Sequence, residues 1–232
     1  MHHFSVLAMA KEPVPGRVKT RLTPPFTPHV GANLYEAMLS DTMDVLISLK
    51  GAKKYLFIEP ENSRYFDRFH GSGITIFPQS GRDLGEKMLR AVKLVMAQTG
   101  LPTVIVGTDI PLLKASTIIN SVSMLSRADV VLGPCEDGGY YLIGLNKFTP
   151  LPFLGIPWST DRVLRKTVSN LKAEKLSYAL TEKLFDIDTA GDIGKHINFI
   201  GKNRGDDISR TRFSRAAMKL HTHLGRLIEP ET

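Results

Sequence analysis

The chain has 232 residues, of which 42% are apolar and 23% are charged, and it contains one cysteine. This length suits one domain and suffices to bury a core without disulfide bonds. No apolar run approaches the roughly 18 residues that a membrane span requires. The lone cysteine, Cys135, excludes a disulfide framework and a zinc site built from cysteines. We therefore expect a single cytoplasmic domain over residues 1–232.

The net charge of +7 is concentrated in two segments. Residues 11–21 and residues 202–232 are both clearly basic, whereas the rest of the chain is near neutral. Two local basic segments fit a phosphate-bearing ligand better than an extended nucleic-acid surface. The second segment predicts a basic C-terminal helix within residues 205–232. We interpret its basic stripe as a solvated face and do not expect it to bind nucleic acid.

Short apolar runs alternate with amphipathic stretches along the chain. The apolar runs predict strands at 4–10, 55–58, 74–77, 103–106, 130–132, 140–145 and 177–180. Helical spacing predicts helices near 34–49, 88–96, 116–125, 162–171 and 209–227, with another beginning near Ala190. Near-continuous apolar strands are typical of a sheet that helices cover on both faces. The pattern therefore predicts an α/β fold with three layers, α/β/α, around a mostly parallel sheet.

One connection breaks this rhythm. Residues 133–139 separate two predicted strands and are too few for a crossover helix. The two strands should therefore run antiparallel, which makes the sheet mixed.

A basic loop follows the first predicted strand. It contains a glycine, Gly16, and four basic side chains, Lys11, Arg17, Lys19 and Arg21. Arginine binds phosphate oxygens in a bidentate way, and lysine acts as a point charge. Ligands of open α/β sheets bind beyond the carboxyl ends of the strands, so the loop predicts a phosphate site. A solvated basic loop is the alternative.

Carboxylates follow two other predicted elements. Strand 103–106 leads into Gly-Thr-Asp, which ends at Asp109. Further along, Asp186 and Asp188 flank Ile187, so both point to the same side of an extended segment. Carboxylates bind Mg²⁺ together with phosphate oxygens and water. We favour Asp109 and Asp188 as metal ligands. Asp186 is the alternative to Asp188, and helix capping is the alternative role for these aspartates.

A dense turn joins the strands 130–132 and 140–145. It reads Glu-Asp-Gly-Gly-Tyr-Tyr and includes Asp137, Gly138 and Gly139. Glycine lets a ligand approach backbone N–H groups, and a carboxylate can accept hydrogen bonds from sugar hydroxyls. A plain hairpin turn is the alternative.

The loop after strand 74–77 provides a second glycine-rich segment. Gln79 presents a side-chain amide at the strand end, and Gly85 follows at the start of a helix. Such an amide can recognise a base edge through a donor and an acceptor. The alternative is a helix start capped by Asp83 and Glu86. Elsewhere, Trp158 either lines an acceptor pocket or belongs to the core.

Together these segments resemble a bacterial glycosyltransferase-like family, the selenodomain-associated transferase 1-like family. It belongs to the nucleotide-diphospho-sugar transferase superfamily, which has the Rossmann-like GT-A fold. The resemblance covers residues 4–192 and rests on five motifs in order: Pro-Gly-Arg-Val-Lys-Thr-Arg-Leu, Gly-Thr-Asp-Ile-Pro, Glu-Asp-Gly-Gly-Tyr-Tyr-Leu-Ile-Gly-Leu, Pro-Trp-Ser-Thr and Asp-Ile-Asp-Thr. The basic segment 205–232 lies outside it.

The resemblance implies that a nucleotide or nucleotide-sugar binds with Mg²⁺ or Mn²⁺ on its phosphates, beside a small-molecule acceptor. It assigns catalysis to Lys19 and Asp109, and the metal to Asp109 and Asp188. The implied nucleotide and phosphate contacts are Lys11, Gly16, Arg17, Lys19, Arg21, Gln79 and Gly85. The implied contacts with the second substrate are Asp137, Gly138, Gly139 and Trp158.

The sequence departs from the family in one respect. Many glycosyltransferases of this fold have Asp-x-Asp where this chain has Thr108-Asp109-Ile110. The early basic loop is more similar to that of nucleotidyltransferases. We therefore expect transfer from a nucleotide-sugar, with nucleotidyl transfer that releases pyrophosphate from a triphosphate as the first alternative. A non-catalytic nucleotide-binding protein is the second alternative.

Overall fold

A computed structural model describes residues 3–203 and 207–228 of the chain. The chain forms two compact units. The first unit comprises residues 1–12, 45–108 and 113–185, and the second comprises residues 13–44, 109–112 and 186–232. The expected single domain over 1–232 stays a prediction. Within the basic C-terminal segment, residues 204–206 and 229–232 lie outside the described residues.

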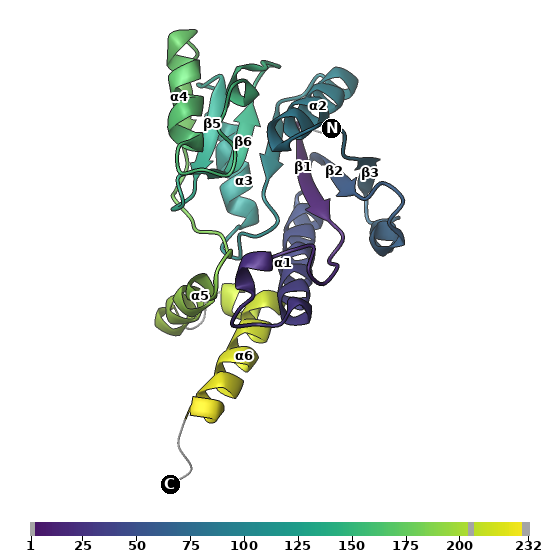
Figure 1. The fold of residues 1–232 in the computed structure, drawn as a ribbon. Helices are drawn as coiled ribbons and strands as arrows, with labels where there is room; N and C mark the ends of the chain where they lie inside the picture. Colours follow the sequence, from purple (N-terminus) through teal and green to yellow (C-terminus); the bar gives the residue numbers. More distant parts are fainter. Residues whose placement is uncertain (1–2, 204–206, 229–232) are drawn as a thin grey trace. The chain divides into compact units, whose positions relative to one another are not determined.

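The first unit is built on a sheet of seven strands among the described residues, in the order β3-β2-β1-β4-β6-β5-β7 (Figure 1). The strands are β1 (Phe4–Lys11), β2 (Ala52–Glu59), β3 (Ile74–Pro78), β4 (Thr103–Val106), β5 (Val130–Pro134), β6 (Tyr140–Leu145) and β7 (Tyr178–Leu180). Strand β6 runs antiparallel to β4 and β5, and the other neighbouring strands are parallel. The predicted mixed, mostly parallel sheet is therefore confirmed.

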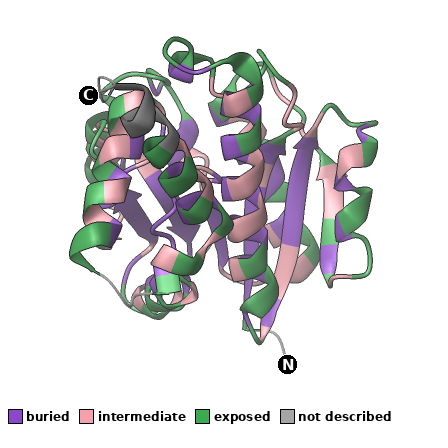
Figure 2. Ribbon diagram, turned by 90° about the horizontal axis from the view of Figure 1, so that it is seen from below, coloured by how far each residue is buried: buried purple, intermediate pink, exposed green. Residues whose placement is uncertain are grey.

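Helices cover both faces of this sheet. One face packs against α2 (Leu84–Thr99) and α4 (Val163–Ala173), where Leu7, Ile105 and Ile143 share a cluster with Val92 of α2 and Leu171 of α4. The other face packs against α3 (Ala115–Met124) and the residue after it, because a Cβ on Gly144 would lie 3.2 Å from a side-chain carbon of Leu125. Figure 2 shows most of the strand residues as buried. The predicted three-layer arrangement is confirmed within this unit.

Two elements extend beyond their predicted bounds. Strand β2 begins at Ala52 because its backbone pairs with β1 along eight positions, including the polar Lys53 and Lys54. Helix α1 (Pro28–Ser48) begins six residues before the predicted start. Thr27 precedes it, and its Oγ1 accepts a hydrogen bond from Val30 N at 3.3 Å. This start has an N-cap threonine followed by proline in the first turn. Short 3₁₀ turns also occur at Arg64–Phe69 and Leu151–Phe153.

The second unit contains η1 (Thr20–Leu22), α1 up to Asp44, α5 (Ala190–Lys202), η4 (Asp207–Arg210) and α6 (Arg212–Ile228). Helix α5 packs against α6 through a fully buried His196, whose Nε2 lies 2.8 Å from Ser214 Oγ. The ring of Phe213, also fully buried, meets the imidazole edge-on. The predicted C-terminal helix is present, but residues 207–210 form the 3₁₀ turn that precedes it.

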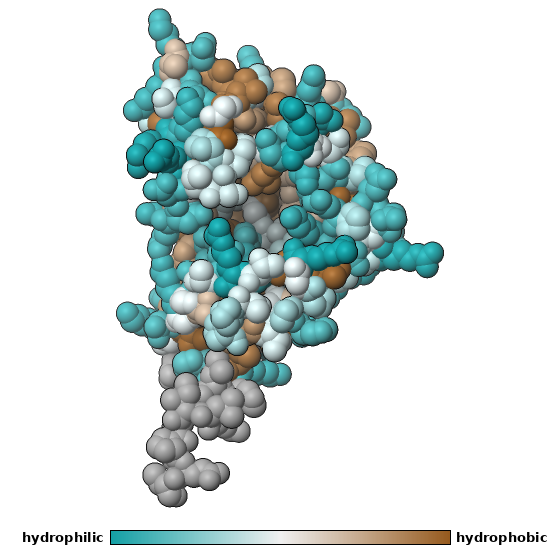
Figure 3. All heavy atoms as spheres, in the orientation of Figure 1, coloured by the Kyte–Doolittle hydropathy of each residue, from teal (hydrophilic) through white to brown (hydrophobic). Residues whose placement is uncertain are grey.

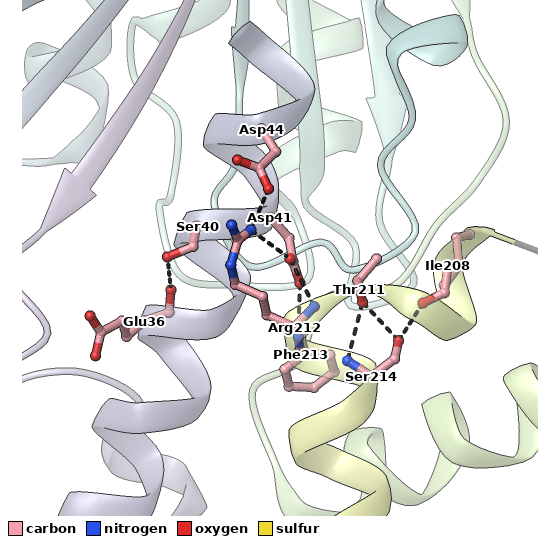
Figure 4. Close-up of polar contacts among 9 residues, drawn as sticks. All are labelled: Glu36, Ser40, Asp41, Asp44, Ile208, Thr211, Arg212, Phe213 and Ser214. Atoms are coloured by element: carbon pink, nitrogen blue, oxygen red, sulfur yellow. Dashed lines mark hydrogen bonds and ion pairs between the residues drawn. The ribbon is translucent and has the colours of Figure 1, made fainter. Parts of the chain in front are cut away.

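Helix α6 is attached to α1 by a carboxylate (Figure 4). Both oxygens of Asp41 accept backbone hydrogen bonds from the first turn of α6, from Arg212 N at 2.9 Å and from Phe213 N at 2.8 Å. The Arg212 guanidinium also contacts Asp41 and Asp44. Asp41 thus satisfies amides that a helix N-terminus leaves unpaired, although it lies far away in sequence.

Hydrophilic side chains make up much of the surface visible in Figure 3, with apolar groups between them. Exposed apolar side chains among the described residues include Leu84, Ile119 and Leu154. Single exposed apolar residues are ordinary on proteins. In the described part of the chain, no helix combines the length and apolar character that a bilayer crossing demands.

Candidate active site

A lysine contacts two of the predicted carboxylates in the second unit. Lys19 Nζ lies 2.9 Å from Asp109 Oδ2 and 3.7 Å from Asp188 Oδ1. Arg21 adds a second cation, since its Nη1 lies 2.7 Å from Asp188 Oδ2. The basic loop, the Gly-Thr-Asp segment and the Asp-Ile-Asp segment therefore meet at one ion cluster. We call Lys19, Arg21, Asp109 and Asp188 the ion cluster below.

The backbone aligns the two acidic segments. Ile187 N donates to Asp109 O at 3.0 Å, and the Ile187 side chain is fully buried. A buried Ile187 turns the residues on either side of it the opposite way, as expected for an extended segment. Asp186 and Asp188 accordingly both act on the charge of Lys19, although the direct contact comes from Asp188. The predicted same-side placement of these aspartates agrees with this geometry.

Lys19 has an unusual backbone conformation. Its φ is 47° and its ψ is 43°, which is the left-handed region that residues with a Cβ seldom adopt. Its carbonyl accepts from Leu22 N at 3.0 Å, and the position where a Cβ of Gly31 would lie is only 3.3 Å from it. Such strain persists where surrounding contacts fix the backbone, and it concentrates at functional sites.

Burial and charge act in opposite directions on Lys19. The side chain is 7% exposed, and this burial alone would lower its pKa. The charge and hydrogen bond of Asp109, followed by the charges of Asp188 and Asp186, outweigh it and raise the pKa above the ordinary value of 10.5. Lys19 is thus a buried, permanently charged ammonium at neutral pH, held by at least two carboxylates.

The carboxylates of the ion cluster fit a divalent cation chemically. Asp109 and Asp188 both contact one ammonium, so their oxygens already converge on a single positive charge. Both side chains remain about one third exposed, at 35% and 34%. Mg²⁺ and Mn²⁺ take oxygen ligands, and Mg²⁺ typically takes one or two carboxylates with phosphate oxygens and water. The donor set therefore suits the predicted metal.

The capping alternatives for these aspartates do not hold. Helix α3 begins at Ala115 after Lys114, so Asp109 is too early in the chain to cap it. Helix α5 is capped by Thr189, whose N–H and Oγ1–H both donate to Asp192. Neither Asp186 nor Asp188 provides that cap.

The rest of the basic loop divides between the two units. Arg17 is exposed in the second unit, and its N–H donates to Val14 O at 3.0 Å. Gly16 has φ 77°, and Pro15 precedes it, as in a type II turn. A Cβ on Gly16 would meet nothing within 4 Å. Gly16 is therefore explained by its positive φ rather than by a close approach of the backbone.

Lys11 belongs to the first unit, at the end of β1. It is the register partner of Glu59, which accepts from Lys87 Nζ at 2.7 Å. The hydrogen bond from Lys87 lowers the pKa of Glu59, and the charge of Lys11 contributes. The structure gives Lys11 this acidic neighbour, and its predicted role toward phosphate stays a prediction.

Gln79 connects two strands in the first unit. Its Nε2 donates to Ala10 O at 2.9 Å and to Phe57 O at 3.0 Å. Both amide hydrogens are thereby used at the ends of β1 and β2, which leaves Oε1 as an acceptor. Recognition of a base edge by both a donor and an acceptor would need an amide hydrogen of Gln79. Both of these hydrogens are already bound by carbonyl groups of the strands.

The next segment starts α2 as the capping alternative predicts. Asp83 Oδ1 accepts from Glu86 N at 2.8 Å, while the Glu86 carboxylate accepts from Arg82 N at 2.9 Å. Hydrogen bonds from Arg82 and Arg90 lower the pKa of Glu86 to about 2. This helix start is explained without a ligand.

The glycines of the turn between β5 and β6 are used mainly for packing. Asp137 Oδ1 accepts from Gly139 N at 2.8 Å, which closes the turn locally. Gly138 has φ 89°, and a Cβ there would lie 2.2 Å from Asp161 O. Its own carbonyl accepts from Leu164 N at 2.9 Å. These contacts fix the turn against the start of α4, and the predicted contact of Asp137, Gly138 and Gly139 with a second substrate stays a prediction.

Trp158 and Gly85 lie in contact within the first unit. A Cβ on Gly85 would lie 2.2 Å from Trp158 Nε1, so the indole packs directly on the first turn of α2. The ring of Tyr140 meets Trp158 edge-on at a centroid distance of 6.2 Å. Ser159, next in the chain, has a left-handed φ of 63°. Gly85, a predicted base contact, and Trp158, a predicted acceptor contact, therefore pack against each other. Trp158 is half-buried.

Sequence reasoning missed Gly31, and it missed the packing of Tyr140, a residue of the dense turn, on Trp158. Gly31 lies in the first turns of α1, where its missing Cβ leaves room for the Lys19 carbonyl, and it precedes the predicted start of that helix at residue 34. Tyr140 packs on Trp158, and burial raises its pKa well above the ordinary value. A tyrosine in an apolar strand gives no signal of such packing.

The architecture is that of the nucleotide-diphospho-sugar transferases. A candidate nucleotide-diphospho-sugar transferase from Desulfovibrio desulfuricans G20 superposes with a TM-score of 0.86 at 27% identity, over 100% of both chains. The chain belongs to the family described as "Uncharacterized protein conserved in bacteria (DUF2064)", which matches residues 42–160, more than half of its length. The predicted superfamily membership is therefore confirmed.

Nucleotidyltransferases are among the similar proteins. A 2-phospho-L-lactate guanylyltransferase from Methanothermobacter thermautotrophicus is 26% identical over 183 residues, which cover 77% of this chain and 78% of that protein. CMP:2-keto-3-deoxy-manno-octonic acid synthetase, in complex with CTP, has a TM-score of 0.54 at 10% identity, over 87% of this chain and 99% of its own. At that identity it shows a shared fold alone.

Proposed function

We propose that this protein is a nucleotidyltransferase that joins a nucleoside monophosphate group to a small acceptor and releases pyrophosphate. The observation behind this proposal is the ion cluster, in which the predicted phosphate-binding Lys19 contacts the predicted metal ligands Asp109 and Asp188. A triphosphate bound with a divalent cation needs cationic side chains and carboxylates at one place. The guanylyltransferase relative supports the same reaction class.

In this proposal, Asp109 and Asp188 hold Mg²⁺ or Mn²⁺, which when bound neutralises charge on the triphosphate. An oxygen of the acceptor forms a bond to the α-phosphorus as the bond from that phosphorus to the β-phosphate bridging oxygen breaks. Lys19 and Arg21 bind the phosphate oxygens on which negative charge accumulates. Lys11, Gly16 and Arg17 are proposed as further phosphate contacts.

The remaining contacts are proposed within the first unit. We assign Gln79, through its side-chain oxygen, and Gly85 to the base, and Asp137, Gly138, Gly139 and Trp158 to the acceptor. The half-buried indole of Trp158 supports the last assignment, because a partly exposed aromatic ring can pack against a small ligand.

Glycosyl transfer is the second candidate. The similarity to a candidate nucleotide-diphospho-sugar transferase over the full length of both chains favours it. In that reaction the acceptor attacks the sugar carbon and a nucleoside diphosphate leaves. The two reactions share the metal site and differ in the leaving group.

The test is product identity. The purified protein is incubated with Mg²⁺ or Mn²⁺, a panel of nucleoside triphosphates and nucleotide-sugars, and small phosphorylated and carboxylated acceptors. GTP is tried first, because the similar curated protein is a guanylyltransferase. We expect acceptor-dependent pyrophosphate. Release of a nucleoside diphosphate from a nucleotide-sugar would instead establish glycosyl transfer.

A matched pair of variants separates enzyme from binding protein. Asp109→Asn removes one charge from the ion cluster, whereas Asp207→Asn removes one from a side chain that is 96% exposed in the same unit. We expect Asp109→Asn to abolish turnover and metal-dependent nucleotide binding while Asp207→Asn retains both. Nucleotide binding that is independent of metal and of Asp109, without any turnover, would indicate a non-catalytic binding protein.

A further inference from the structure

The ammonium of Lys19 contacts both carboxylates that are proposed to hold the metal. Its Nζ is 2.9 Å from Asp109 Oδ2 and 3.7 Å from Asp188 Oδ1, so it contacts oxygens of both proposed ligands. The side chain is 7% exposed, while each carboxylate is about one third exposed. Lys19 is therefore the most buried member of the ion cluster, whereas the second cation, Arg21, is 70% exposed.

Two cations cannot share these oxygens without strong repulsion. A divalent ion bound by the carboxylates at roughly 2.1 Å would lie within a few ångströms of the ammonium. Like charges at such a distance repel strongly in a partly desolvated site. Metal binding at Asp109 and Asp188 therefore requires Lys19 Nζ to move away.

The chain provides the freedom for that movement. The backbone of Lys19 is fixed by the bond from Leu22 N to its carbonyl and by the close packing of Gly31. Its side chain is a flexible stem of four carbons that ends in a compact charge. The ammonium can therefore swing to a new partner while the loop keeps its fold.

We propose that Lys19 is an internal counter-ion, which holds Asp109 and Asp188 together without metal and leaves them for a ligand phosphate when the metal binds. This inference rests on the metal site of the proposed function and adds a regulation to it. Metal alone must displace the ammonium into water, whereas metal with a phosphate offers the ammonium a new partner. Metal and nucleotide therefore bind cooperatively, which keeps the site from binding free metal tightly.

The first test is Mn²⁺ binding without nucleotide, measured by the electron paramagnetic resonance signal of free Mn²⁺. Lys19→Met keeps an unbranched side chain that lacks the terminal ammonium, and Lys202→Met is the matched control on the exposed end of α5. We expect Lys19→Met to bind Mn²⁺ at least about tenfold more tightly than the native protein. Lys202→Met should match the native protein. Lys19→Arg, which keeps the charge, should retain weak binding.

The same variants have a thermal signature. Without metal, Lys19→Met takes the ammonium away from Asp109 and leaves Asp188 with Arg21 alone, so its unfolding temperature should fall below that of Lys202→Met. Saturating Mn²⁺ should raise the unfolding temperature of Lys19→Met by more than it raises that of the native protein. A merely structural lysine would leave the variant destabilised at every metal concentration.

The second test uses the native protein and does not depend on the folding of a variant. Acetic anhydride modifies exposed lysines, and mass spectrometry follows each site. Lys19 should react slowly without metal and several-fold faster with Mg²⁺, while exposed Lys202 stays constant. Added inorganic phosphate should slow Lys19 again, because it offers the released ammonium a partner.

The outcomes separate the two proposals. The counter-ion role is overturned if folded Lys19→Met binds Mn²⁺ no more tightly than the native protein. It is also overturned if Mn²⁺ binds but Mg²⁺ does not change the labelling rate of Lys19. Both results leave the metal site in place. Absence of Mn²⁺ binding in every variant overturns both. Tighter binding by Lys19→Met together with no pyrophosphate in the product assay supports the counter-ion role and contradicts the proposed reaction.

Discussion

Replacement of Asp41 by alanine tests how α6 is held. Asp41 Oδ1 and Oδ2 accept from Arg212 N at 2.9 Å and Phe213 N at 2.8 Å, and the carboxylate is 15% exposed. Loss of an N-cap acceptor costs roughly 0.5–2 kcal/mol, and loss of a negative charge at a helix N-terminus costs roughly 0.3–1 kcal/mol. Alanine returns roughly 0.5 kcal/mol through its better helix propensity inside α1.

The expected net loss is about 1.5 kcal/mol of unfolding free energy, or a fall of roughly 3–6 °C in the unfolding temperature of a chain this size. Circular dichroism during thermal and urea unfolding measures both quantities. Hydrogen exchange should also quicken at the amides of Arg212 and Phe213, which lose their acceptor.

Asp44→Ala is the matched control. Asp44 lies one turn along the same helix, is 59% exposed, and contacts the Arg212 guanidinium without receiving a backbone N–H. Exposed ion pairs contribute roughly 0–1 kcal/mol, so Asp44→Ala should lose less than half as much stability. Equal losses in the two variants would refute the capping role, as would an Asp41→Ala protein within about 0.5 kcal/mol of the native one.

Two further predictions concern the rings of His196 and Trp158. Burial lowers the pKa of His196 from 6.5 to about 4, so the unfolded chain binds this proton at a higher pH than the folded chain does. The free energy of unfolding should therefore fall by about 3 kcal/mol as the pH drops from 6.5 to about 4. Urea unfolding at several pH values should show this slope in His221→Asn, on the exposed side of α6, and a flatter one in His196→Asn. Gly85→Ala places a methyl group 2.2 Å from Trp158 Nε1, so it should displace the indole and shift its fluorescence to longer wavelength. Gly194→Ala has open space and should leave the emission unchanged, and an unchanged Gly85→Ala spectrum would contradict the packing.

The topology could be predicted because it depends on local features. Apolar runs of strand length marked the sheet, and the short link 133–139 required β5 and β6 to run antiparallel. The ends of elements were harder to predict because they depend on tertiary pairing. Lys53 and Lys54 look like loop residues in sequence, yet β1 supplies a complete backbone partner for them. Backbone pairing thus outweighed their low strand propensity.

The sequence predicted which carboxylates of the ion cluster would come together, but it predicted the position of the cations only in part. Asp109 follows a strand, and alternation around Ile187 fixes the direction of Asp188. The position of the Lys19 ammonium depends on a left-handed backbone at a residue with a long side chain. Sequence rules place glycine or asparagine in that region, so nothing local indicated the conformation.

The glycines show why function is harder to read than fold. A missing Cβ permits a ligand to approach the backbone, and it equally permits another part of the protein to do so. At Gly85 the neighbour is the Trp158 indole, and at Gly138 it is the Asp161 backbone. Sequence alone gives the same signal in both cases. A ligand can contact Gly85 only if Trp158 moves away. Trp158→Phe makes the ring smaller and should therefore change nucleotide affinity if Gly85 contacts the base. An unchanged affinity would argue against Gly85 as a base contact.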